Sequence, residues 1–511
     1  MKFGFLFGAG AEVGYGLPSG GMFALDIFRY DSTESKKLFK EMRDGVDLSY
    51  PYATEWLPDG FMSKNISSFG KTIFQNIIQD TVEHNRDLII EKLNSFDDIA
   101  KTQAAELRKD IGINIDEVIK KMISRDVDTL SLSQSISFIT EFEKGNNLFA
   151  NHYFAALLMI YKNKSLMKPD ERNEMGKILL SLLQLLVGAL SEELARKIND
   201  SLFNKKDEEI DLLDDLGEFI QLNYSSSGII GMEYLLEMEN PDLKSDPGII
   251  IRFAQMVLES IYSSVLDYKS IIDSYWHYLY SPKKEWAKFC KICIFLLNVR
   301  NYISEKSKKI DLTANHDGYY NMLRDSIDKR EFECTSIATT NYNHFIEDII
   351  GTNIIYLNGS TETWYDPYIN RIGTKEALTS NEKHILVPLM FTQSGTKPMT
   401  SISMSEKYVG AYQHWKDSDA LVVIGFGFGV DDEHINGIIR TLIDIDNKKV
   451  IVITIKRNQS AESELSTIKK RLKIYNSNNL SVILVNEKGI EVETGKKWTE
   501  SIMNYEIINA G

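Results

Sequence analysis

At 511 residues the chain exceeds what one hydrophobic core usually supports, so we expect two folded units or one unit that carries a large insertion. Hydrophobic residues make up 43% and charged residues 26%, which is the balance of a globular protein and excludes a disordered or fibrous one. The formal net charge of -15, without a run of lysine and arginine, argues against direct binding of nucleic acid.

The cysteines and apolar runs predict a cytoplasmic protein that binds no metal and does not enter a membrane. The three cysteines are too few for a disulfide framework, which indicates a reducing compartment. Cys290 and Cys293 form only half of a four-ligand zinc site, and their apolar neighbours favour a buried helix instead. The longest apolar run, 178–190, is shorter than the ~20 residues that a membrane crossing requires.

Residues 1–30 predict a strand, a loop and a helix. The apolar run 1–8 is typical of a buried strand. It ends in a loop whose glycines are Gly8, Gly10, Gly14 and Gly16. Pro18 follows, and proline suits the first turn of a helix because its missing N–H would be unpaired there anyway.

The middle of the chain, 31–330, predicts an all-α domain inserted between two parts of a sheet. Helical spacing of apolar residues runs through 70–98, 110–124, 174–204, 210–223 and 249–304. Strand patterns return only afterwards, at 335–340, 353–357, 385–390, 420–424, 450–455 and 480–485.

The C-terminal part, 331–511, predicts the remainder of the sheet. Residues 420–455 are its clearest unit: an unbroken apolar run, a helix over 433–444 and a second apolar run. This order is typical of a βαβ unit in a parallel sheet with helices on both faces. The predicted fold class is therefore α/β, with a Rossmann-like parallel sheet split by the long all-α insertion.

Two segments carry the residues expected to bind a ligand. The glycines from Gly8 to Gly16 suit a backbone that passes close to a pyrophosphate, although a turn that merely joins strand to helix also explains them. Val13 breaks the G-x-G-x-x-G pattern, which disfavours an ordinary dehydrogenase. Asn341 follows the strand 335–340, where its amide suits a ribose hydroxyl or a water, or caps the next helix.

Four motifs in their order along the chain resemble the Sir2-like proteins of bacterial antiphage defence. The motifs are Gly8-Ala9-Gly10 with Gly16-Leu17-Pro18, Thr340-Asn341-Tyr342, Tyr356-Leu357-Asn358-Gly359-Ser360, and Gly425-Phe426-Gly427-Phe428 with Asp432 to Asn436. The resemblance covers residues 1–25 and about 330–490 and leaves the helical middle unmatched.

The resemblance implies a Rossmann-like sheet that binds NAD+ as substrate and hydrolyses it to ADP-ribose and nicotinamide. Asn341 would position the nicotinamide ribose and the incoming nucleophile, together with Asn358 in the catalytic site. The residues expected to bind NAD+ are Gly8, Ala9, Gly10, Gly16, Pro18, Thr340, Asn343, Gly359, Ser360, Gly425, Phe426 and Gly427.

Three positions depart from the family pattern. Asn343 replaces an aspartate, Ala11 and Glu12 replace a small polar residue, and Asn358 stands where the family has a histidine. A neutral amide has no protonation step near neutral pH, so Asn358 cannot act as a general base. Hydrolysis is still expected, because an oxocarbenium-like centre can capture an oriented neutral water. Deacylation, which needs a base, is disfavoured.

The predicted function is NAD+ hydrolysis that depletes NAD+ in a defence response, with control by autoinhibition, assembly or a missing partner. Expected partners are further copies of the chain and a phage protein trigger or a partner ATPase. The alternative, which rests on Asn358, is a sensor or scaffold that binds NAD or ADP-ribose without turnover and works with a partner protein.

Overall fold

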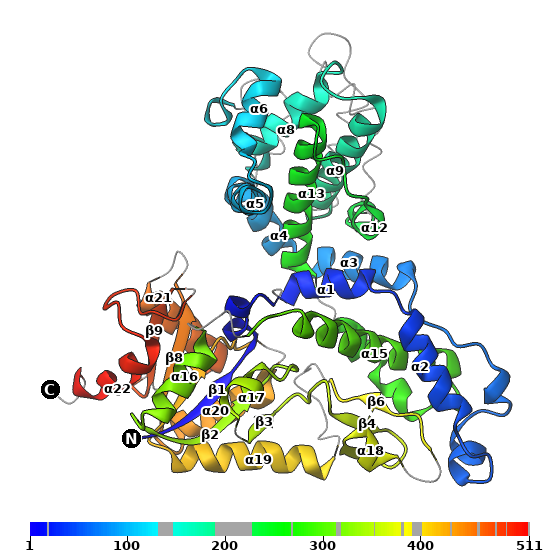
Figure 1. Ribbon diagram of the computed structural model, residues 1–511, viewed down its shortest axis with the longest axis vertical. Helices are drawn as coiled ribbons and strands as arrows, with labels where there is room; N and C mark the ends of the chain where they lie inside the picture. Colours follow the sequence, from blue (N-terminus) through cyan, green and yellow to red (C-terminus); the bar gives the residue numbers. More distant parts are fainter. Residues whose placement is uncertain are drawn as a thin grey trace. The chain divides into compact units, whose positions relative to one another are not determined.

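The computed structural model divides into two compact units (Figure 1). The α/β unit comprises 1–19, 30–69 and 269–511, and the helical unit comprises 20–29 and 70–268. The structure describes residues 1–17, 20–130, 147–189, 227–266, 269–312, 318–351, 353–379, 383–390, 401–429, 432–456, 460–475, 478–486 and 488–508. Pro18 and the helix predicted over 210–223 lie outside these residues.

Every described element of the helical unit is a helix. These are α1 (Gly20–Arg29), α3 (Lys71–His84), α4 (Arg86–Asn94), α5 (Phe96–Ile111), α6 (Ile115–Ile123), η5 (Val127–Thr129), η6 (Leu148–Ala150), α8 (His152–Lys162), α9 (Pro169–Ala189), α12 (Ile229–Glu237) and α13 (Asp246–Val265). Apolar residues of α13 are buried on all sides, because α1, α5 and α9 pack around it. An ion pair of 2.8 Å between Arg29 Nη1 and Glu259 Oε1 joins α1 to α13.

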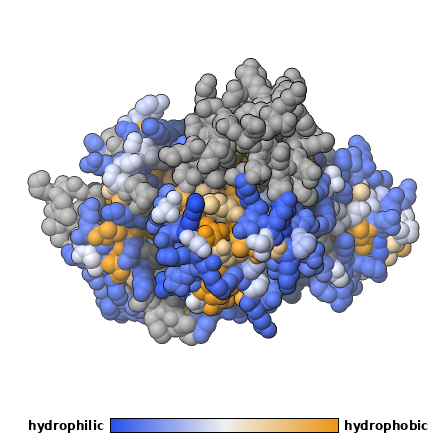
Figure 2. Space-filling model, turned by 90° about the horizontal axis from the view of Figure 1, so that it is seen from above, coloured by the Kyte–Doolittle hydropathy of each residue, from blue (hydrophilic) through white to orange (hydrophobic). Residues whose placement is uncertain are grey.

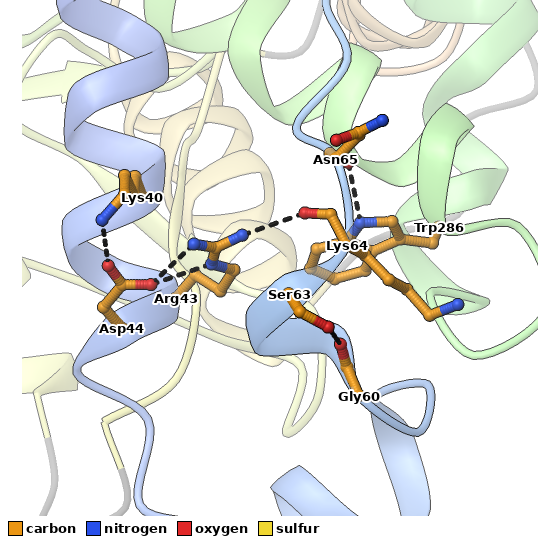
Figure 3. Close-up of polar contacts among 8 residues, drawn as sticks. All are labelled: Lys40, Arg43, Asp44, Gly60, Ser63, Lys64, Asn65 and Trp286. Atoms are coloured by element: carbon orange, nitrogen blue, oxygen red, sulfur yellow. Dashed lines mark hydrogen bonds and ion pairs between the residues drawn. The ribbon is translucent and has the colours of Figure 1, made fainter.

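The segment 30–69 packs with helices of the α/β unit. The segment itself contains α2 (Thr33–Asp44) and the short turns η3 (Tyr52–Trp56) and η4 (Phe61–Ser63). It packs with α15 (Trp286–Lys308), which also contacts α14 (Lys269–Tyr275) and η8 (Trp276–Tyr280). Arg43 Nη1 donates to Lys64 O at 3.0 Å, and Trp286 Nε1 donates to Asn65 O at 3.1 Å (Figure 3). The compact units therefore divide at residues other than the predicted domain limits of 30 and 330.

Six parallel strands form the main sheet in the order β3-β2-β1-β7-β8-β9. Their bounds are β1 (Lys2–Phe7), β2 (Glu333–Thr339), β3 (Ile354–Tyr356), β7 (Ala420–Ile424), β8 (Lys449–Ile455) and β9 (Leu480–Val485). Numbered along the chain within this sheet, the order is 3-2-1-4-5-6, which is that of a Rossmann-like doubly wound sheet. The predicted parallel α/β sheet is confirmed, and the order reverses between β1 and β7.

Helices cover both faces of this sheet because its strands are apolar on both faces. On one face lie α16 (Tyr319–Asp328), α17 (Phe345–Ile350) and α22 (Trp498–Ile508), and on the other lie α19 (Ile402–Asp417), α20 (Glu433–Asp444) and α21 (Ala461–Leu472). Strand β1 shows the alternation: Phe5 and Phe7 pack under the first group, whereas Leu6 packs under the second.

A second, antiparallel sheet follows β3 and has the strand order β5-β4-β6. It consists of β4 (Trp364–Asp366), β5 (Arg371–Gly373) and β6 (Val387–Pro388), with the short helix α18 (Lys375–Leu378). The strand predicted over 385–390 thus lies in this small sheet and not beside the parallel strands. A short apolar run indicates burial, but it does not specify a pairing partner.

One face of the protein can be compared by its hydropathy. On the face seen in Figure 2, hydrophilic residues predominate and apolar residues gather in separate patches. In the part of the chain that the structure describes, no helix combines the length and the apolar character that a membrane crossing needs.

Candidate site at the switch point of the sheet

Two glycine-containing loops meet where the carboxyl ends of β1 and β7 lie side by side. Gly8 N donates to Ile424 O at 2.9 Å, and Gly10 N donates to Gly425 O at 2.9 Å. A Cβ on Gly8 would lie 2.6 Å from Gly425 O, and a Cβ on Gly425 would meet Ala11 N. Gly425 also has a φ of +65°, which favours glycine. These glycines are therefore required for the close approach of the two loops.

The first loop uses most of its backbone N–H groups within the protein. It forms two short turns, η1 (Ala9–Ala11) and η2 (Val13–Tyr15), and ends at Gly16 with a φ of 93°. The N–H groups that donate to protein carbonyls belong to Gly8, Gly10, Ala11, Glu12, Tyr15 and Gly16. These six groups are not available to a phosphate. Packing against the loop after β7 explains Gly8 and Gly10, whereas Gly16 has open space around it and is favoured by its positive φ. Contacts of Gly8, Ala9, Gly10 and Gly16 with NAD+ stay a prediction.

Asn341 lies on the loop that follows β2, beside the end of β1. Its Nδ2 donates to Gly8 O at 3.1 Å and to the Tyr320 hydroxyl at 3.3 Å, and the side chain is 6% exposed. Thr340 N donates to Phe7 O at 2.9 Å, which joins the same two strand ends. Asn341 is not the helix cap that its position also allowed, since Asn343 Oδ1 accepts the bond from Phe345 N that opens α17.

Glu12 is buried beneath these loops and was missed as a site residue. The Tyr320 hydroxyl donates to its Oε1 at 2.8 Å, and Asn343 Nδ2 donates to its Oε2 at 2.5 Å. Burial raises the pKa of Glu12 to about 7, although bonds from Asn343, Tyr320 and Asn341 favour the ionised form. Glu12 and Asn343 therefore bind each other.

Aromatic residues extend this buried polar cluster. The Tyr15 hydroxyl donates to Asn321 Oδ1 at 2.9 Å and accepts from Tyr320 N at 2.9 Å, and the Tyr15 and Tyr320 rings stack at 5.3 Å. The sequence feature that could have identified Glu12 is an acidic residue inside a glycine-rich loop. The sequence contains no such feature for Tyr320 and Asn321, because they lie in a helix outside every motif.

Asn358 lies at the end of β3 and reaches the loop of β2. Its Nδ2 donates to Thr340 O at 3.2 Å. The next two predicted site residues turn toward the segment of the second sheet. A Cβ on Gly359, whose φ is +85°, would meet Leu389 O, and Ser360 Oγ lies 2.8 Å from Thr363 Oγ1. The contacts of Gly359 and Ser360 thus do not bring them to Asn341.

The predicted residues after β7 divide between core and surface. Phe426 is buried in the core, and its ring lies 5.1 Å from that of Phe428. Gly427 is exposed, and its carbonyl accepts from Arg471 Nη1 at 2.8 Å. Of this motif, Gly425 and the backbone of Phe426 lie against the loop after β1.

A second buried carboxylate lies in the small sheet. His384 Nδ1 donates to Asp366 Oδ2 at 2.6 Å, and Tyr368 N donates to Asp366 Oδ1 at 2.9 Å. The ring of Tyr52 lies 4.1 Å from that of His384. These contacts join β4 to the segment before β6 and to residues near position 52, so this cluster connects chain segments.

Among the described residues, no three His, Cys, Asp or Glu side chains gather in a way that could hold a metal ion. Cys290 and Cys293 are buried within α15, and burial raises the pKa of both thiols.

No family model, no curated protein and no solved structure matches the chain.

Proposed function

We propose that the loops at the carboxyl ends of β1, β2 and β7 bind NAD+ and that the protein hydrolyses the nicotinamide–ribose bond. The observation that supports this most is the position of Asn341, whose amide is held beside the switch point of a doubly wound sheet. Ligands of such sheets bind outside the carboxyl ends of the strands where the order reverses. The Sir2-like resemblance of the same residues supports NAD+ as that ligand.

In this reaction the bond between the ribose C1′ and the nicotinamide nitrogen breaks, and nicotinamide leaves as a neutral base with the bonding electrons. Water then bonds to C1′ and releases one proton to solvent, which yields ADP-ribose. Because the reacting carbon carries oxocarbenium character, the principal task of the protein is to orient the ribose and the water. The carbonyl oxygen of Asn341 accepts a hydrogen bond from either group, since an amide oxygen is an acceptor.

Nicotinamide release from NAD+ by the purified protein tests this proposal. We expect Asn341→Ala to reduce release by about 100-fold or more, because positioning groups contribute effects of that order. Asn301→Ala is the matched control, since Asn301 is an asparagine on α15 that bonds Ser35. Asn358→His should increase release. Release that is unchanged in Asn341→Ala, with the fold verified by thermal unfolding, would overturn the proposal.

A second candidate is a nucleotide sensor without turnover. The amide of Asn358 already donates to Thr340 O, which supports a structural role for this residue. A sensor would show thermal stabilisation by NAD+ or ADP-ribose without any nicotinamide product. The two candidates are therefore separated by measuring stabilisation and product in the same samples.

The cellular role that we propose is depletion of NAD+ during phage infection, triggered by a phage protein or a partner ATPase and dependent on self-assembly. Bacteria that express the protein should lose NAD+ after infection, and bacteria that express Asn341→Ala should not. Equal NAD+ content in both cultures would contradict this role while leaving the biochemical proposal intact.

A further inference from the structure

The hydrolysis as proposed does not use the buried carboxyl of Glu12. Its side chain is 3% exposed, and its oxygens accept from the Tyr320 hydroxyl and from Asn343 Nδ2. Its charge interacts with the hydroxyls of Tyr15, Tyr320 and Tyr356, and burial raises the pKa of all three, so they are neutral. Among the described residues, no lysine, arginine or histidine pairs with Glu12. In the part of the chain that the structure describes, only neutral groups therefore donate to this carboxyl.

The hydrogen bonds between Asn341 and Glu12 run in one direction. An ionised carboxylate only accepts, so the Tyr320 proton points to Glu12 Oε1. The Tyr320 oxygen is then left to accept from Asn341 Nδ2, whose other hydrogen goes to Gly8 O. Both amide hydrogens are thus used, which fixes the orientation of the amide and leaves its carbonyl oxygen for a ligand.

A protonated Glu12 reverses part of this sequence of bonds. Its carboxyl proton needs an acceptor, and among its partners the amides of Asn343 and Asn341 are donors, so the acceptor is the Tyr320 oxygen. Tyr320 must then turn its own proton away from Glu12 and toward Asn341. Asn341 Nδ2 then loses the Tyr320 oxygen as an acceptor, so the amide is held less firmly.

We propose that Glu12 is a positioning residue: its ionised carboxylate holds the Asn341 amide through the Tyr320 hydroxyl, and the site works best while Glu12 is ionised. This inference rests on the proposed function, because it concerns the orientation of Asn341 toward the ribose or water.

The test is the pH dependence of nicotinamide release from NAD+ between about pH 5.5 and about pH 9. Wild-type kcat should fall by about tenfold in total as the pH drops below the Glu12 pKa of about 7, which is the loss expected when the link is removed, with a smaller change in KM. Tyr320→Phe removes the link, so it should lower kcat about tenfold at about pH 8 and abolish this inflection. Glu12→Gln should likewise show no inflection.

Tyr319→Phe is the matched control, because Tyr319 is a buried tyrosine of the same helix that contacts Trp498. It should retain the wild-type profile. An inflection near neutrality that survives in Tyr320→Phe or Glu12→Gln would overturn the positioning role.

A wild-type protein that releases no nicotinamide at any pH would overturn the proposed hydrolysis instead. Calorimetric binding of NAD+ then tests Glu12 separately. Wild-type binding should weaken below about pH 7 and that of Tyr320→Phe should not. Binding that is independent of pH in both proteins would overturn the positioning role, and absence of binding would overturn both inferences.

Discussion

Two buried carboxylates of the α/β unit have different kinds of partners. Asp366, in the small sheet, is 0% exposed and accepts from a histidine and from a backbone N–H. Glu12, at the switch point of the main sheet, is 3% exposed and accepts only from neutral side chains of two other segments. A carboxylate with a histidine and backbone donors joins segments of a fold. One with neutral donors alone titrates near neutrality and can respond to pH.

The largest expected effect follows from substitution of Asp366, the carboxylate of this pair that joins segments of the fold. Asp366→Ala leaves His384 and the Tyr368 N–H without their acceptor in the interior, and we expect a loss of about 3–5 kcal/mol in the free energy of unfolding. Urea unfolding at neutral pH measures it. The exposed Asp328→Ala should change stability by less than about 0.5 kcal/mol. Equal effects of the two variants would contradict the structural role of Asp366.

A smaller loss is expected at the loops that surround Glu12. Gly425→Ala combines a left-handed φ of +65° with a Cβ that meets Ala11 N, so it should cost at least about 2 kcal/mol. Gly427→Ala has open space around its Cβ and is the matched control, with a change below about 1 kcal/mol. Thermal and urea unfolding of both variants would reveal whether loop contact or ligand binding requires Gly425.

The smallest effect is the pH dependence that Glu12 gives to stability. The folded chain binds the Glu12 proton more tightly than the unfolded chain does, since burial raises the pKa from 4.5 to about 7. This contribution to stability is complete below pH 4.5 and is lost as the pH rises through about 7. From about pH 5.5 to about pH 8, wild type should therefore lose about 2 kcal/mol relative to Glu12→Gln. A constant difference in unfolding free energy between the two proteins would contradict the raised pKa.

Patterns within single segments were sufficient to predict the elements of the sheet. The apolar run 420–424 and the helix 433–444 have the same bounds in the structure, since burial on both faces leaves an unbroken apolar strand and a helical apolar stripe. The glycines after β1 and β7 were identifiable as special positions. The reason why glycine is needed there could not be identified from the sequence, because it lies in the close approach of two loops that are distant in sequence.

By itself the sequence determined a parallel α/β sheet, the loops that end its strands, and Asn341 as a polar residue at one of those ends. Only the tertiary structure decided that β1 lies between β2 and β7 and that residues 385–390 join a separate sheet. It also brought Tyr320 and Asn343 to Glu12. The physical reason is that periodicity records which side of a segment is buried, whereas a strand's neighbours and a buried acid's donors are set by contacts between segments far apart in the chain.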